Sequence, residues 1–177
     1  MNLELEKFRR LFKRYPEVFR GKNFKFDEFK QVYEQTNGYS DLTVFYYDKD
    51  IIHYIIAALV MKEKKYLDIN FMNAYQLIDI YLGNIEELPC LSVITNDVIA
   101  IYDGVGMPNK QKGNILIQVI EQQRMAGRKF WLFYKGNASR LNSMYPEVME
   151  IIKDDNFSVI EYHQMSKRRL DDEEDII

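Results

Sequence analysis

The stretch 97–106, DVIAIYDGVG, is the part of the sequence that decides the fold prediction. A run of apolar, mostly β-branched residues ends at an acid, Asp103, which is followed by Gly104 and Gly106. This pattern is typical of a buried parallel strand that ends at the carboxyl edge of a sheet, where α/β proteins bind ligands. The stretch therefore predicts an α/β domain, with Asp103 as the first candidate for a functional acid.

The sequence on both sides of this strand alternates between strand-like and helix-like patterns. Strands are predicted over 42–47, 66–71, 98–102, 130–134 and 158–162, and helices over 51–64, 73–81, 114–125 and 145–153. Strands that alternate with helices of about ten residues imply right-handed crossovers and a parallel sheet. We therefore expect a three-layer α/β/α domain with a mainly parallel sheet of about five strands.

The first forty residues differ from the rest because their patterns are helical. Apolar residues recur at helical spacing over 2–14, and a second helix is predicted over 26–35. The other end of the chain carries a run of acids at 171–175. These features predict an N-terminal helical segment (1–40), an α/β domain (41–165) and a charged, flexible tail (166–177).

Composition excludes few classes of function. The chain has 177 residues, enough for a proper core, and its net charge of -3 argues neither for nor against an anionic partner. Its single cysteine, Cys90, excludes an intramolecular disulfide and suits a reducing compartment. The longest apolar run, 51–61, is too short to span a bilayer, and His53 within it is expected to be a packed core residue. With no signal peptide recognised, we expect a cytoplasmic protein without a membrane partner.

The order of these patterns resembles the AAA+ core of the bacterial helicase-loader and transposition-helper ATPases, the DnaC/DnaI/IstB-like group. The resemblance covers roughly residues 42–162 and is best where DVIAIYDGVG is followed by NILIQVIEQQRMAGRK and FWLFY. It implies a P-loop-NTPase-like fold. It also implies a setting in DNA replication or in a mobile element such as a phage or plasmid.

The sequence departs from this family first at the phosphate-binding loop. A nucleotide-hydrolysing member carries G-x-x-x-x-G-K-[ST] after its first strand, because the backbone N–H groups cradle phosphates. Here that position holds Asp48, Lys49 and Asp50, and the motif occurs nowhere in the chain. The central strand of the family ends in two acids, whereas this chain has Tyr102 and Asp103. A phenol that stays protonated near neutral pH is a poor magnesium ligand.

Two further departures concern the following strand and helix. Phe133, Tyr134 and Lys135 stand where the family has a polar pair, and Asn137 is out of register. The helix after that strand has no arginine over 145–150, where the family has one that reaches a neighbouring subunit. We therefore expect a domain that binds no cofactor and no metal and is not an enzyme, with Asp103 as a remnant Walker B acid.

The leading hypothesis is a non-catalytic protein that binds a helicase, a related ATPase or a second copy of itself. Its candidate partner-binding residues lie on the first helix: Phe8, Arg9, Arg10, Phe12, Lys13 and Arg14. The cations could instead contact nucleic acid, with aromatic residues interleaved, or could form the solvated face of an amphipathic helix.

A second alternative is an enzyme that uses Asp103 on a small phosphorylated ligand or on nucleic acid. It predicts a pocket beside Asp103, lined by Asp48, Lys49, Lys135 and Asn137. The simpler interpretation is an acid that caps a strand-to-loop turn, because a lone acid without a base or metal has no mechanism.

Overall fold

A five-stranded parallel sheet forms the centre of the computed structural model, which describes residues 9–63, 68–81, 97–103 and 110–162. The strands lie in the order β2-β3-β4-β1-β5. Their bounds are β1 (Leu42–Tyr47), β2 (Ile69–Asn73), β3 (Val98–Asp103), β4 (Lys129–Lys135) and β5 (Ser158–Glu161). Every pair of neighbours is parallel, so the predicted sheet is confirmed.

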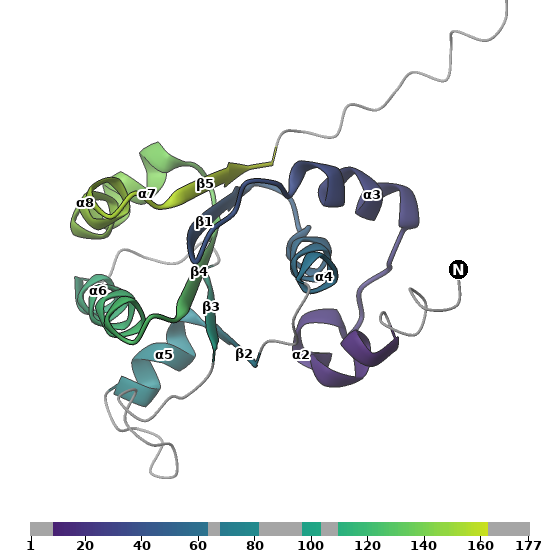
Figure 1. Ribbon diagram of the computed structural model, residues 1–177, viewed down its shortest axis with the longest axis horizontal. Coiled ribbons are helices and arrows are strands. Elements are labelled where there is room, and N and C mark those ends of the chain that lie inside the picture. Colours follow the sequence, from purple (N-terminus) through teal and green to yellow (C-terminus); the bar gives the residue numbers. More distant parts are fainter. Residues whose placement is uncertain (1–8, 64–67, 82–96, 104–109, 163–177) are drawn as a thin grey trace, which may run out of the picture.

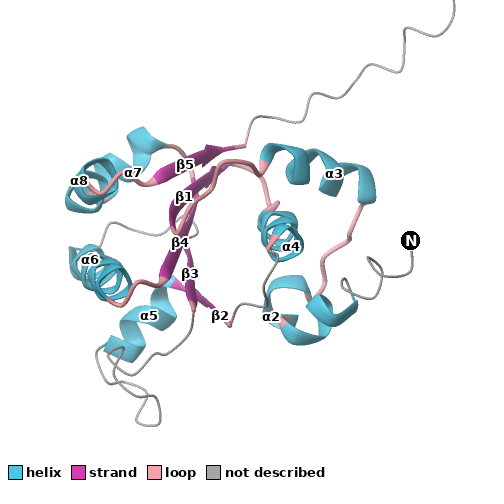
Figure 2. Ribbon diagram, viewed as in Figure 1, coloured by secondary structure: helices cyan, strands magenta, loops and turns pink. Residues whose placement is uncertain are grey.

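Helices cover both faces of the sheet and complete the predicted three layers (Figures 1 and 2). One face carries α2 (Pro16–Phe19), α3 (Phe26–Gln35) and α4 (Ile52–Lys62). The other face carries α5 (Ala74–Tyr81), α6 (Lys110–Met125), α7 (Ala138–Met144) and α8 (Pro146–Asp154). None of the helices in the described ranges is long and apolar enough to cross a membrane.

The core has two halves, which meet at the sheet because successive side chains of a strand point to opposite faces. In β4, Trp131 and Phe133 belong to the half that contains α4, whereas Phe130, Leu132 and Tyr134 belong to the half beneath α5–α8. All five side chains are at most 3% exposed. Burial on both faces explains why the sequence of this strand is continuously apolar instead of alternating.

The N-terminal helices contribute to the same core as the sheet. Leu11, Phe19 and Val32 are buried in the half that contains α4. The ring of Tyr15 lies edge-on to that of Phe71 in β2, with centroids 4.7 Å apart. The apolar face of this segment therefore packs on α4 and on the sheet.

Several elements differ from the sequence prediction: β2 spans Ile69–Asn73 instead of 66–71, and the short helix α2 was not predicted. Two further differences concern helices that begin at the carboxyl edge of the sheet. Helix α6 begins at Lys110, whereas the apolar pattern places its start at residue 114. Helix α7 was not predicted, and it begins after Asn137, whose side chain caps it. Both differences fall on polar stretches, where periodicity of apolar residues carries no signal.

Candidate functional site

The candidate site lies at the carboxyl edge of the sheet, between β1 and β4. These strands are neighbours, and Tyr47 pairs with Lys135 at their last residues. The chain leaves β1 for α4 on one face of the sheet and leaves β4 for α7 and α8 on the other (Figure 1). Open α/β sheets bind ligands in the crevice at such a topological switch point. The residues that follow β1, β3 and β4 are therefore the ones to inspect.

The turn after β1 is short and closed on itself. Residues 48–51 alone separate β1 from α4, and Ile51 N–H donates a hydrogen bond of 2.8 Å to the carbonyl of Lys49. Asp50 pairs with Lys22, with 2.5 Å between Oδ2 and Nζ. This hydrogen bond holds the pKa of Asp50 below its ordinary value. The turn has no glycine and is shorter than a phosphate-binding loop of the G-x-x-x-x-G-K-[ST] type.

The acid at the end of β3 has a partner that the sequence analysis did not identify. Asp103 Oδ1 accepts a hydrogen bond of 2.7 Å from Nζ of Lys112 in α6. The two side chains are 3% and 1% exposed. Burial raises the pKa of Asp103 against the opposing effect of the lysine. Burial, the largest single effect, disfavours the charged lysine, but the interactions of Lys112 with Asp103 and Tyr145 together outweigh it, so the pKa of Lys112 is raised. We therefore take Lys112 as charged at neutral pH.

Two aromatic rings enclose this ion pair. Nζ of Lys112 lies 5.1 Å from the ring centroid of Tyr75 in α5 and 5.5 Å from that of Tyr145, between α7 and α8. The hydroxyl of Tyr145 is buried beside the pair, where its interactions with Asp103 and Lys112 favour the charged form of each. A side chain at Gly113 would approach the Tyr145 ring to 3.3 Å, which shows how closely α6 packs there.

The residues that follow β4 have structural roles, among them Asn137, which the sequence analysis considered as part of a ligand pocket. Gly136 N–H donates to the carbonyl of Tyr47, and its φ of +149° suits glycine. A Cβ there would lie 2.9 Å from the ring of Tyr134. Asn137 Oδ1 accepts a hydrogen bond from the backbone N–H of Arg140 and so caps α7.

The pocket expected by the enzyme hypothesis would lie beside Asp103. Asp48, Lys49 and Asn137 are exposed and Lys135 is partly exposed, whereas Asp103 is buried. The polar contact that the structure gives Asp103 comes from Lys112 instead. Its burial leaves the carboxylate inaccessible to a substrate in this arrangement. Among the described residues no group of three or more His, Cys, Asp or Glu could hold a metal ion.

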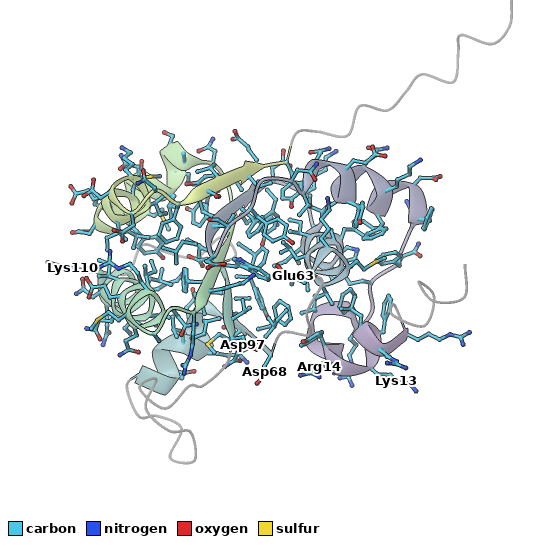
Figure 3. The ribbon with its side chains drawn as sticks, in the orientation of Figure 1. Lys13, Arg14, Glu63, Asp68, Asp97 and Lys110 are labelled. Atoms are coloured by element: carbon cyan, nitrogen blue, oxygen red, sulfur yellow. The ribbon has the colours of Figure 1, made fainter. Side chains whose placement is uncertain are left out.

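The candidate residues of the first helix divide into two sets. Residues 9–14 are helical, and Arg9, Arg10, Lys13 and Arg14 are exposed. Arg14 also forms an ion pair of 3.4 Å with Asp68, and Figure 3 shows the two labelled side chains near each other. Phe12 is partly buried, with its ring centroid 4.7 Å from that of Phe19 and 5.7 Å from that of Phe24. Phe8 lies outside the described residues.

Lys112 is the residue at this site that sequence reasoning missed. It lies in the polar stretch KQKG at 110–113, which reads as a loop or an exposed first turn. Lysine is almost never fully buried unless it is paired, so its identity favoured the surface. The only available signal was its separation of nine residues from Asp103, which does not by itself predict contact.

Comparison with known proteins supports the fold. No family model and no curated protein matches this sequence. The structure is similar to a DNA replication initiation factor, with a TM-score of 0.52 and 9% identity over 82% of this chain and 49% of that one. It is also similar to AMPPCP-bound DnaA from Aquifex aeolicus, with a TM-score of 0.55 and 10% identity over 81% of this chain and 47% of that one.

A third similar structure is a protein of Streptococcus pyogenes serotype M3 assigned as a primosome component. Its TM-score is 0.52, with 13% identity over 77% of this chain and 78% of that one. The chain spans about half the length of the first two structures. At these identities the similarity shows the fold alone, a parallel sheet with helices on both faces.

Proposed function

We propose that this protein acts in DNA replication as a non-catalytic, AAA+-like protein that works by binding another protein. The setting is supported by three structures of similar fold, namely a replication initiation factor, DnaA and a protein assigned as a primosome component. The partner we propose is a helicase or a related ATPase, or a second copy of this chain. A chain with this fold but without a nucleotide site would act by binding other molecules at its surface.

The observation that carries the proposal is the turn between β1 and α4. A triphosphate at the switch point needs free backbone N–H groups and close approach to the chain. Here Ile51 N–H is used within the turn, and no glycine permits close approach. Asp48 also places an exposed carboxylate near the amino end of α4, where it would repel an anion, whereas Asp50 is paired with Lys22.

Direct nucleic-acid binding is a second candidate, favoured by the exposure of the cations on the first helix. Arg9, Arg10 and Lys13 are exposed while Leu11 is buried and Phe12 is partly buried. The apolar side of the helix is therefore used by the domain itself, and Arg9 and Lys13 are exposed where they can contact phosphates.

Nucleotide binding tests the non-catalytic part of the proposal. We expect no binding of a fluorescent ATP analogue with Mg²⁺ up to millimolar concentrations, and no rise in melting temperature on adding ATP and Mg²⁺. Saturable micromolar binding would contradict the proposal, above all if Lys49→Ala abolished it. Pull-down of the tagged chain from its native host, followed by mass spectrometry, tests the partner. Recovery of a helicase or related ATPase is expected, and its absence in repeated experiments counts against that partner.

A further inference from the structure

Strand β5 forms an open edge of the sheet. It pairs with β1 on one side, and none of the described strands lies on its other side. Figure 1 shows it at the end of the sheet, with α3 toward one face and α7 and α8 toward the other. An edge strand presents a row of unpaired backbone groups to which a strand of another chain can add. The free side of β5 is therefore a candidate interaction surface.

The direction of the backbone groups of β5 follows from its bonds to β1. The N–H of Tyr162, just after β5, donates a hydrogen bond of 3.0 Å to the carbonyl of Tyr46 in β1. Backbone groups of successive residues in a strand point to opposite sides, so Ile160 also faces β1. Val159 and Glu161 therefore face the free side. Each presents one N–H and one C=O there, and no described strand bonds to them.

The side chains of β5 suit an edge that another strand covers. Val159 is 52% exposed, although it is a β-branched apolar residue in a strand. Ile160 is 7% exposed and lies in the half of the core that contains α4. Glu161 carries the one charge of the strand, whose sequence is SVIE. The strand therefore lacks lysine and proline, which commonly keep an exposed edge from pairing.

We propose that β5 is a self-association surface, where it pairs antiparallel with β5 of a second copy across a two-fold axis at Ile160. The inference rests on the proposed function, in which the protein acts by binding, and it selects a second copy among the partners named there. Val159 exchanges two backbone hydrogen bonds with Glu161 of the second copy, and the axis repeats this pair. The outward backbone groups of both strands are then satisfied, and the two sheets become one.

The occupant is a second copy because this strand is complementary to itself in one register. Pairing centred on Ile160 sets each Glu161 opposite Val159, so the two carboxylates are not opposed. A register centred on Val159 would need the N–H of Phe157, which already donates a hydrogen bond of 3.2 Å to the carbonyl of Ile152. A register centred on Glu161 would oppose the two carboxylates, which is unfavourable.

Sedimentation velocity of the full chain tests this pairing. The wild type should sediment as a dimer at micromolar concentrations. Val159→Glu should raise the dissociation constant about tenfold or more, because the axis opposes each new carboxylate to Glu161 of the other copy. Adding Glu161→Lys to this variant should restore the dimer, because the opposed charges then have opposite signs. Met125→Glu is the matched control, since Met125 is an exposed apolar residue outside β5, and it should leave the dimer unchanged.

A proline variant tests the backbone hydrogen bonds. Val159→Pro removes an N–H that faces away from β1, so the sheet should tolerate the change whereas the pairing with a second copy should not. Circular dichroism and urea unfolding check the fold of each variant. Val159→Glu carries the test if the proline variant does not fold.

A wild type that stays monomeric at millimolar concentration would overturn the inference. A dimer that Val159→Glu or a folded Val159→Pro leaves intact would overturn it as well, and so would failure of Glu161→Lys to restore the dimer. None of these results affects the nucleotide-binding test or the recovery of a helicase or related ATPase in the pull-down, which judge the proposed function separately.

Discussion

His53 is a buried residue whose environment departs from its ordinary chemistry. It lies in the first turn of α4 and is 4% exposed, as expected for a packed core residue. Its ring lies 4.1 Å from that of Tyr54 and 6.4 Å from that of Phe24, measured between centroids. Neither ring nitrogen has a hydrogen-bond partner within the described residues. Burial therefore lowers its pKa below the ordinary value of 6.5, although the charge of Asp50 opposes this.

This environment predicts that acid destabilises the protein through His53. Because the pKa is lowered in the folded state, the unfolded chain binds the proton first as the pH falls. The stabilising contribution is therefore present above pH 6.5 and is lost as the pH falls through the folded pKa. Urea unfolding between about pH 7.5 and 5 should show this loss in the wild type and a flatter profile in His53→Leu. The other histidine, His163, is common to both proteins, so equal slopes would contradict the prediction.

At the scale of elements, caps decide where the helices at the carboxyl edge begin. Helix α7 follows β4 after Gly136 and Asn137, and Asn137 supplies the side-chain acceptor for its first turn. Helix α8 begins with Pro146 at its first position, where the missing N–H costs nothing. The sequence analysis predicted no helix over 138–144, because Leu141 is the one fully buried residue of α7.

Replacing Asn137 tests its structural role. Asn137→Ala should lower the free energy of unfolding by about 1 kcal/mol, because the N–H of Arg140 loses its acceptor at 2.9 Å. Asn137→Asp should keep most of the stability, because a carboxylate also caps a helix. Urea unfolding of the two variants provides the measurement. An equal loss in both would show that Asn137 acts through its amide group rather than as a cap.

At the scale of the whole molecule, the N-terminal helices are more basic than the chain as a whole. The described segment 9–39 carries eight Lys and Arg against four Asp and Glu, although the chain as a whole has a net charge of -3. Its helical residues cover one face together with α4 (Figure 1). The outer surface of the N-terminal helices is therefore where the second candidate function would act.

A DNA-binding measurement tests whether the exposed cations of the first helix contact phosphates. Fluorescence anisotropy with a labelled oligonucleotide should show binding at low salt that weakens as salt rises. Combined Arg9→Gln, Arg10→Gln and Lys13→Gln changes should weaken it and lower the salt slope by roughly 0.7–0.9 for each phosphate that the variant no longer neutralises. Lys153→Gln, on exposed α8 across the sheet, is the control and should change little. Absence of binding by the wild type at low salt would exclude the candidate.

The strands were the most predictable part of the fold. The bounds of β1 match the predicted 42–47, and β3 exceeds its prediction only by Asp103. These strands are buried on both faces, so their apolar runs are continuous and end sharply. At the site, the acid at the end of β3 and the short turn after β1 were predicted, whereas Lys112 and the cap at Asn137 were not. The latter two act through polar contacts, which leave no periodic signal in the sequence.

The sequence by itself determined the alternation of strands and helices, the absence of a phosphate-binding motif and the position of Asp103 at the end of a strand. Each of these depends on residues that are close in the chain. Tertiary structure decided that β1 lies between β4 and β5, that Phe12 packs against Phe19, and that Lys112 meets Asp103. The physical reason is that periodicity reports which face of an element is buried but not what lies against it. Lys112 can contact Asp103 only because α6 packs beside β3 in the folded protein.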